Sequence, residues 1–191
     1  MNDESDAELV RRHLSGDRSA FGVLVERHQR RVYNLAYRML GRPEDAADAT
    51  QDAFVTAMRK LGGFRGTSAF TTWLHRVAVN ICYDQLRKRA REIPVEEHEE
   101  APITGAADMA DTSATAVDVQ RALLTVPEEF RAVLILHDVQ GVPYEAIAEA
   151  LGAPLGTIKS RLHRGRLALA RAMRGEQPAG SRASNPRGTQ R

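Results

Sequence analysis

The stretch YEAIAEALGAPLGTIKSRLHRGRLALARAMR, residues 144–174, decides the predicted fold of the C-terminal half of the chain. Its first eight residues and the run from Pro154 to Arg174 are each predicted as helix, and Gly152 allows a sharp turn between them. At about 100° per residue, the second helix carries one narrow apolar stripe, predicted to be buried. That stripe consists of Leu155, Ile158, Leu162 and Leu169. The pattern predicts a helix-turn-helix.

The other side of the second helix is basic, and no acidic residue occurs from Ala150 to Gly175. Short polar and cationic side chains near the start of such a helix suit base edges in a major groove. The residues expected there are Lys159, Ser160, His163 and Arg164. The residues expected on phosphates are Arg166, Arg171 and Arg174. Charge alone would also fit a solvated helix end in an ordinary bundle.

Composition limits the classes of protein that fit. The chain has 191 residues, 42% of them hydrophobic, enough for one ordinary domain or two small ones. It has no apolar run long enough to cross a bilayer and no signal-peptide pattern at its acidic N-terminus, so a cytoplasmic location is expected. Cys82 is the single cysteine, which excludes an internal disulfide. Histidine spacing argues against a metal site, and no nucleophile elbow or P-loop occurs, so neither a cofactor nor catalysis is expected.

The formal charge of +2 conceals two basic blocks around an acidic one. Residues 92–115 hold seven acidic residues, no Lys or Arg, and two prolines without a sustained period. This segment is predicted to be a flexible linker, either a solvated spacer or a mimic of nucleic acid. The sequence predicts an all-α fold with two small helical domains, 1–91 and 116–174, joined by linker 92–115. The tail 175–191 is expected to be disordered.

The first block predicts three helices: one capped near Asp17 and closed by Gly41, one from Pro43 to Gly62, and one over 68–89. The middle helix has a predicted buried stripe of Ala46, Ala53, Phe54, Ala57, Met58 and Leu61. Its opposite side carries Asp45, Asp48 and Asp52, bordered by Gln51. Three interpretations stay open for this acidic side: a docking surface for a basic partner, a magnesium site, or a solvated face. A magnesium enzyme would need a second aspartate-rich helix, which the sequence lacks.

The third helix of this block has a mixed polar and aromatic face. Its members Arg76, Asn80, Tyr83 and Arg87 share an arc of about 60°. Trp73 borders this face, and Phe64, Arg65 and Phe70 lie upstream. Stacking rings, arginines and an amide are what an unpaired base requires. Simple core packing is the alternative for the three aromatic residues.

Three segments together resemble one family. They are DAADATQDAFVTAMRKL (45–61), FRGTSAFTTWLHRVAVNICYDQLRKR (64–89) and VPYEAIAEALGAPLGTIKSRLHRGRLAL (142–169). In this order, around a linker, they resemble the extracytoplasmic-function (ECF, group 4) sigma factors of bacterial RNA polymerase. The helix-turn-helix alone would not be specific, because many regulators carry one.

The resemblance implies a stress-responsive promoter-specificity subunit whose partners are core RNA polymerase and promoter DNA. It implies a region 2-like domain that docks on the polymerase clamp through Asp45, Asp48, Gln51 and Asp52 and captures bases of the −10 element around Trp73 and Asn80. It implies a region 4-like domain that reads the −35 element and contacts the polymerase flap. Such proteins are often held inactive by an anti-sigma factor, frequently one anchored in a membrane.

One departure from the larger housekeeping sigma factors concerns Trp73-Leu74, where those proteins place two tryptophans. We expect weaker promoter melting, and broader promoter use after replacement of Leu74 by Trp. Thr67 stands where relatives often carry an acid, which affects −10 preference. The alternative function is a free-standing helix-turn-helix regulator, which would bind palindromic DNA alone as a dimer.

Overall fold

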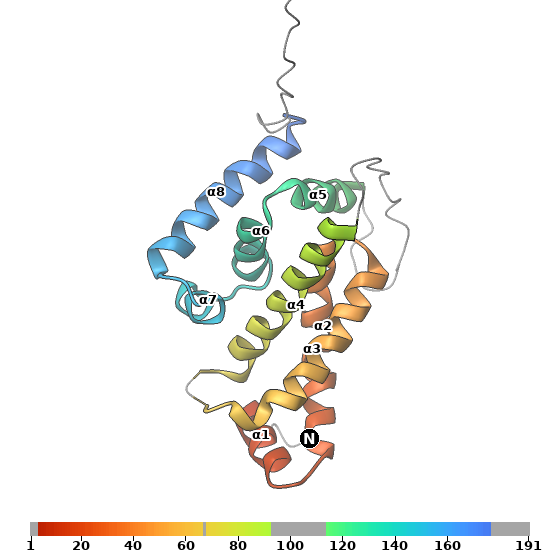
Figure 1. Cartoon of the computed structure of the whole chain (residues 1–191). Helices are drawn as coiled ribbons and strands as arrows, with labels where there is room; N and C mark the ends of the chain where they lie inside the picture. Colours follow the sequence, from red (N-terminus) through yellow and green to blue (C-terminus); the bar gives the residue numbers. More distant parts are fainter. Residues whose placement is uncertain (1–3, 67, 93–113, 177–191) are drawn as a thin grey trace, which may run out of the picture.

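The computed structural model describes residues 4–66, 68–92 and 114–176, and every regular element within them is a helix (Figure 1). The elements in chain order are α1 (Asp6–Leu14), α2 (Ser19–Leu40), α3 (Pro43–Lys60), the 3₁₀ turn η1 (Leu61–Gly63), α4 (Phe70–Glu92), α5 (Ala114–Thr125), α6 (Glu128–Leu134), the π-helical turn η2 (Ile135–Val139), α7 (Tyr144–Leu151) and α8 (Leu155–Met173). The all-α fold class is confirmed. Most of the predicted linker and tail lie outside the described residues.

Helices α1–α4 form an N-terminal unit in which α2 packs against α1, α3 and α4. The start of α2 is fixed by Asp17, whose Oδ1 accepts hydrogen bonds from the Ser19 amide at 3.0 Å and the Ser19 hydroxyl at 2.5 Å. Its end is fixed by Gly41, whose φ of 85° is strained for any residue with a side chain. Pro43 occupies the first turn of α3, where its missing N–H costs no hydrogen bond.

Two features of this unit differ from the sequence prediction. Helix α1 was not predicted, because within its nine residues only Leu9 and Val10 are fully buried and they supply little periodic signal. Met58 is 47% exposed, so its assignment to the buried stripe of α3 is wrong. The seam of α3 is made by alanines, including Ala49, that let α2 approach closely, and Met58 lies at its margin.

Helices α5–α8 form a C-terminal unit that contains the predicted helix-turn-helix, α7 and α8. Gly152 joins the two helices with a φ of 60°. Ile158 and Leu162 are buried at 0% and 3% exposure, whereas Leu155 is 36% exposed, so Leu155 is wrongly placed in the seam. Gly165 lies against α6, where an added Cβ would come within 3.0 Å of the Leu134 side chain.

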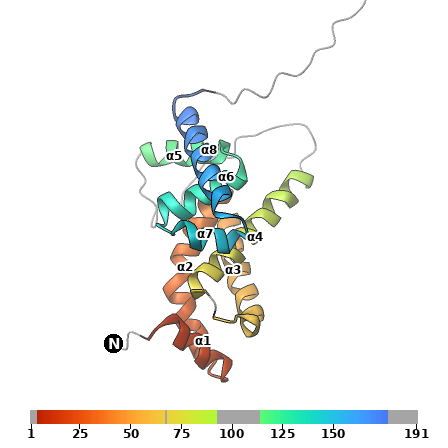
Figure 2. The same ribbon diagram turned by 90° about the vertical axis from the view of Figure 1, so that its left-hand side faces the viewer.

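The two units pack together over α2 and α4 (Figure 2), and their buried apolar side chains form one cluster. Helix α7 lies on α4, and α5 lies at the C-terminal end of α2. Gln120 Nε2 donates to the Tyr37 carbonyl at 3.1 Å, and the buried Arg131 donates to the Met39 carbonyl. The last carbonyls of a helix lack intrahelical partners, and Arg131 supplies a donor to that of Met39. The Tyr37 carbonyl, which already accepts from the Gly41 amide at 2.8 Å, gains Gln120 as a second donor. The sequence did not predict this docking.

Candidate nucleic-acid and polymerase interface

The exposed side of α8 carries the four residues predicted to contact base edges. We call Lys159, Ser160, His163 and Arg164 the reading face; all four are exposed. Ile158 and Leu162 on the opposite side are buried against the rest of the C-terminal unit. No acidic residue follows Ala150 within α7 or α8, so α8 itself presents no carboxylate to approaching phosphates; the nearby Glu129 of α6 is paired with Arg161 at 3.3 Å.

The three arginines predicted to contact phosphates have different surroundings. Arg166 is held by Asp138, with Nε to Oδ2 at 2.9 Å and Nη2 to Oδ1 at 2.5 Å. This hydrogen-bonded pair lowers the pKa of Asp138 below its usual value. Arg174 pairs with Glu176 at 2.7 Å, and Arg171 is exposed. The sequence could not show the Arg166–Asp138 pair, because its members belong to different helices.

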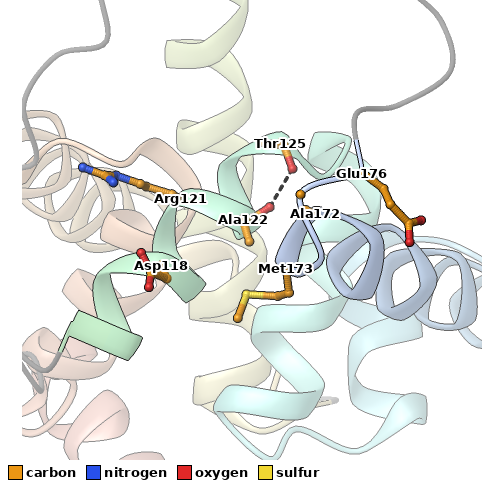
Figure 3. Close-up of a pocket in the computed structure, with 8 residues that line it drawn as sticks. Asp118, Arg121, Ala122, Thr125, Ala172, Met173 and Glu176 are labelled. Carbon is orange, nitrogen blue, oxygen red and sulfur yellow. Dashed lines mark hydrogen bonds between the residues drawn. The ribbon is translucent and has the colours of Figure 1, made fainter.

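A groove of about 450 Å³ lies between α5 and the C-terminal end of α8 (Figure 3). It includes the apolar side chain of Met173, which is 46% exposed, and it contains no residue of the reading face. Thr125 Oγ1 donates to the Ala122 carbonyl at 2.8 Å at its wall. Sequence reasoning missed the groove because its two walls lie far apart along the chain.

On α4, Arg76, Asn80 and Arg87 are exposed on one side. Together with Tyr83 they are called the capture face. Arg87 also contacts Asp84, with Nη1 to Oδ1 at 3.3 Å, but both side chains are exposed and this ion pair contributes little.

Three rings gather beside the capture face. The Trp73 ring centroid lies 5.4 Å from that of Phe64 and 5.9 Å from that of Phe70. Trp73 and Phe64 are half-buried, and Arg65 next to them is exposed. Phe70 is only 3% exposed, so the prediction that it contacts DNA directly does not fit its burial. Phe70 instead packs against Trp73 from the core side.

Tyr83 differs from the other members of the capture face, because it is half-buried beside the C-terminal unit. Burial raises the pKa of its hydroxyl to about 12, and Arg161, Glu128 and Glu129 of that unit are close enough to affect it. In this arrangement Tyr83 faces α6 and α8, while Arg76 and Asn80 face solvent. Sequence spacing could not show this difference.

The acidic side of α3 is presented as the wheel predicts, with Asp48, Gln51 and Asp52 exposed. Asp45 is half-buried and lies 3.8 Å from Arg89 and 3.9 Å from Arg42. We call Asp45, Asp48, Gln51 and Asp52 the clamp face. Among the described residues, no three His, Cys, Asp or Glu side chains are grouped to hold a metal ion. The interpretation of Asp45, Asp48 and Asp52 as a magnesium site therefore gains no support.

Comparison with known proteins decides the family. Residues 24–92 match Sigma-70 region 2, and residues 116–169 match Sigma-70 region 4. The ECF RNA polymerase sigma factor SigM of Mycobacterium tuberculosis is 42% identical over 175 residues, which cover 90% of this chain and 86% of that protein. The chain belongs to the ECF sigma factors. The ECF sigma-E factor of Escherichia coli is 34% identical over 177 residues, covering 86% of this chain and 92% of its own.

Solved structures agree with this assignment. CnrH in complex with the cytosolic domain of CnrY has a TM-score of 0.67 and 26% identity, covering 92% of this chain and 100% of its own. The sigma factor RpoE in complex with the anti-sigma factor NepR, from Bartonella quintana, has a TM-score of 0.65 and 26% identity, covering 82% of this chain and 98% of its own.

As an ECF sigma factor, the chain is a transcription initiation factor that binds core RNA polymerase and promoter DNA. The region 2 match begins within α2 and runs to the end of α4, and the region 4 match lies within α5–α8. The matched spans include every predicted site residue except Arg171 and Arg174. The free-standing regulator finds no support among these relatives. In the described part of the chain, no helix has the length and apolar character needed to cross a membrane.

Proposed function

We propose that the three faces have separate roles in initiation: the clamp face binds core polymerase, the capture face with Trp73 holds −10 bases, and the reading face recognises the −35 element. The main support for this proposal is that α8 has one buried apolar side and one exposed polar side. Its apolar residues Ile158 and Leu162 are buried, and its polar reading face is exposed behind the Gly152 turn. A helix whose apolar side packs against its own domain and whose polar side is exposed suits insertion into a major groove.

The roles of the reading and capture faces are separable by footprinting the holoenzyme on one promoter. Arg164→Ala is expected to weaken protection of the −35 element. Asn80→Ala is expected to leave −35 protection intact and to reduce the permanganate reactivity of unpaired −10 thymines. If the two variants lose the same signals, the assignment of separate roles is wrong.

The clamp face is tested by reversing its charge. Asp48 and Asp52 are exposed, so Asp48→Lys with Asp52→Lys should leave the fold unchanged and lower affinity for core polymerase at least ten-fold. Glu26→Lys is the control, because Glu26 is an exposed acid on α2, outside this face. Normal holoenzyme assembly by the double variant, measured by gel filtration or fluorescence anisotropy, would refute the docking role.

We further propose that the protein works in the cytoplasm, has no catalysis of its own, and is restrained by an anti-sigma factor under unstressed conditions. The complex of RpoE with NepR supports the last point by similarity. Co-purification of the chain from unstressed cells with a partner that blocks core binding would support it. Recovery of the chain without such a partner, and with full core-binding activity, would count against it.

A further inference from the structure

Helix α2 carries a second stripe of polar and cationic side chains. Its members, here called the α2 stripe, are Arg27, Arg31, Asn34 and Arg38. Their spacing of four, three and four residues places them within an arc of about 60°, and the stripe extends about 16 Å along the helix. The capture face on α4 has the same spacing. Neither the family assignment nor the proposed function uses the α2 stripe.

The α2 stripe lines a cleft of about 540 Å³, together with Arg30, His28 and the turn at Val139-Gln140. No carboxylate lines this cleft. Arg27 is neutralised by Asp6 at 2.6 Å. Within the part of the chain that the structure describes, Arg30, Arg31 and Arg38 form no ion pair. Three guanidinium groups therefore share one cleft in which no described residue supplies a carboxylate to pair with them.

The pKa of His75, a buried residue on the neighbouring helix α4, is affected by the same positive charge. Burial is the main cause that lowers the pKa of His75 to about 4, and the charges of Arg31 and His28 lower it further. The Arg31 guanidinium is thus close enough to disfavour a second positive charge on α4. An anion in the cleft would relieve this repulsion.

The position of the α2 stripe relates it to the capture face. Region 4 packs over both α2 and α4 (Figure 2), and Gln140 Nε2 donates to the Arg31 carbonyl at 2.9 Å. Region 4 therefore covers part of the α2 stripe in this conformation. The α2 stripe and the capture face both belong to region 2, and their helices α2 and α4 pack against each other, so the two can meet neighbouring parts of one ligand.

We propose that the α2 stripe and Arg30 bind the sugar-phosphate backbone of promoter DNA beside the bases held by the capture face. This inference rests on the proposed role of the capture face. Guanidinium forks bind phosphate in a bidentate manner, and an amide such as that of Asn34 donates to phosphate oxygens. The length of about 16 Å matches roughly five base pairs of duplex. An acidic protein is less well suited, because Val139 is the one apolar side chain among the cleft residues and protein interfaces have apolar centres.

The first test measures promoter binding by holoenzyme as a function of salt. The triple variant Arg30→Ala, Arg31→Ala, Arg38→Ala should lower the slope of log K against log salt by about 2.7, or about 0.9 per lost phosphate contact. From 50 to 200 mM salt, the wild type should therefore lose about 40-fold more affinity than the variant. The effect should be equal on all promoter sequences. Arg18→Ala is the matched control, because Arg18 is an exposed arginine at the start of α2 on its opposite side.

The second test locates the contact. Cys82 is fully buried and its thiol has a pKa raised to about 12, so a cysteine introduced as Arg31→Cys can be labelled selectively with an iron chelate that cleaves DNA. Backbone cleavage adjoining the −10 element in the holoenzyme complex would support the proposal. An unchanged salt slope together with absent cleavage would overturn it.

Three further outcomes would overturn the proposal, each for a different reason. If the triple variant loses affinity for core polymerase before DNA is added, the α2 stripe is a protein-docking surface and the DNA proposal is wrong. If wild-type holoenzyme itself fails to protect the −10 element, the proposed function fails, and the α2 stripe proposal fails with it. A wild type that protects the promoter and a triple variant that behaves identically would refute the α2 stripe alone.

Discussion

Replacing Arg131 by methionine tests how region 4 is held against region 2. Arg131 is 7% exposed, and burial lowers the pKa of its guanidinium, yet the group stays charged. It donates to three carbonyls: that of Met39 on region 2, that of Leu124 at 2.8 Å, and that of Val126 at 2.9 Å and 3.1 Å. Methionine has a similar length but no donor, so these three carbonyls lose their charged partner.

The expected cost follows from those carbonyls. An unsatisfied buried acceptor costs about 1–3 kcal/mol, and some of this is recovered by packing and by water that enters at the domain boundary. We expect a loss of about 3 kcal/mol in the free energy of unfolding, or roughly 6–12 °C in Tm for a chain of this size. Because one of the bonds crosses between the regions, the radius of gyration should also rise.

Chemical denaturation and small-angle scattering measure the two effects. Arg121→Ala is the control, because Arg121 is an exposed arginine on α5. Gln120→Ala removes the bond to the Tyr37 carbonyl and should loosen docking with a smaller loss of stability. If Arg131→Met unfolds at the wild-type denaturant concentration and keeps the wild-type radius of gyration, the account of the domain boundary is wrong.

Three further predictions concern single residues. His75 has a pKa lowered to about 4 in the folded protein, so the unfolded chain binds a proton at this residue first as pH falls below about 6.5. The free energy of unfolding should therefore drop by about 3 kcal/mol between pH 6.5 and 4. This drop should be absent in His75→Gln when urea melts of the two proteins are compared. Leu74 is 1% exposed, so Leu74→Trp should overpack the core, lower the free energy of unfolding by about 1–3 kcal/mol and lower Tm in calorimetry. A variant with unchanged Tm and broader promoter use would instead support the expectation drawn from the sequence. Arg164→Ala should cost about 1–3 kcal/mol at one −35 position in binding assays on a promoter series, whereas uniform weakening would make Arg164 a phosphate contact.

Sequence periodicity predicted what depends on a single helix. Apart from Leu155 in its first turn, the buried and exposed sides of α8 follow from its spacing, since neighbours three and four residues apart share a face whatever they pack against. Gly152 and Gly41 were placed correctly for a similar local reason, because each turn requires a left-handed φ. The exposed side of α3 was predicted in the same way.

Features that join distant residues could not be predicted. Arg131 contacts Met39 from 92 positions away, and no pattern near either residue signals that bond. Arg166 and Asp138 are 28 positions apart, and their pairing also has no local signal in the sequence. Leu74 shows a different limit: the resemblance marks it as the position of a second stacking ring in larger sigma factors, whereas here its side chain is buried in the core. A family pattern gives the type of residue expected, whereas burial depends on the neighbouring helices.

Run-off transcription with purified core polymerase shows whether the chain confers promoter specificity. Genomic fragments are transcribed with core alone, with core plus the chain, and with the chain carrying both Asn80→Ala and Arg164→Ala. We expect discrete transcripts only when the wild-type chain is added, from start sites that share one −35 and one −10 sequence, and we expect them to be lost with the double variant. Transcription that does not depend on the chain, or a double variant that initiates at the same sites with the same yield, would contradict it.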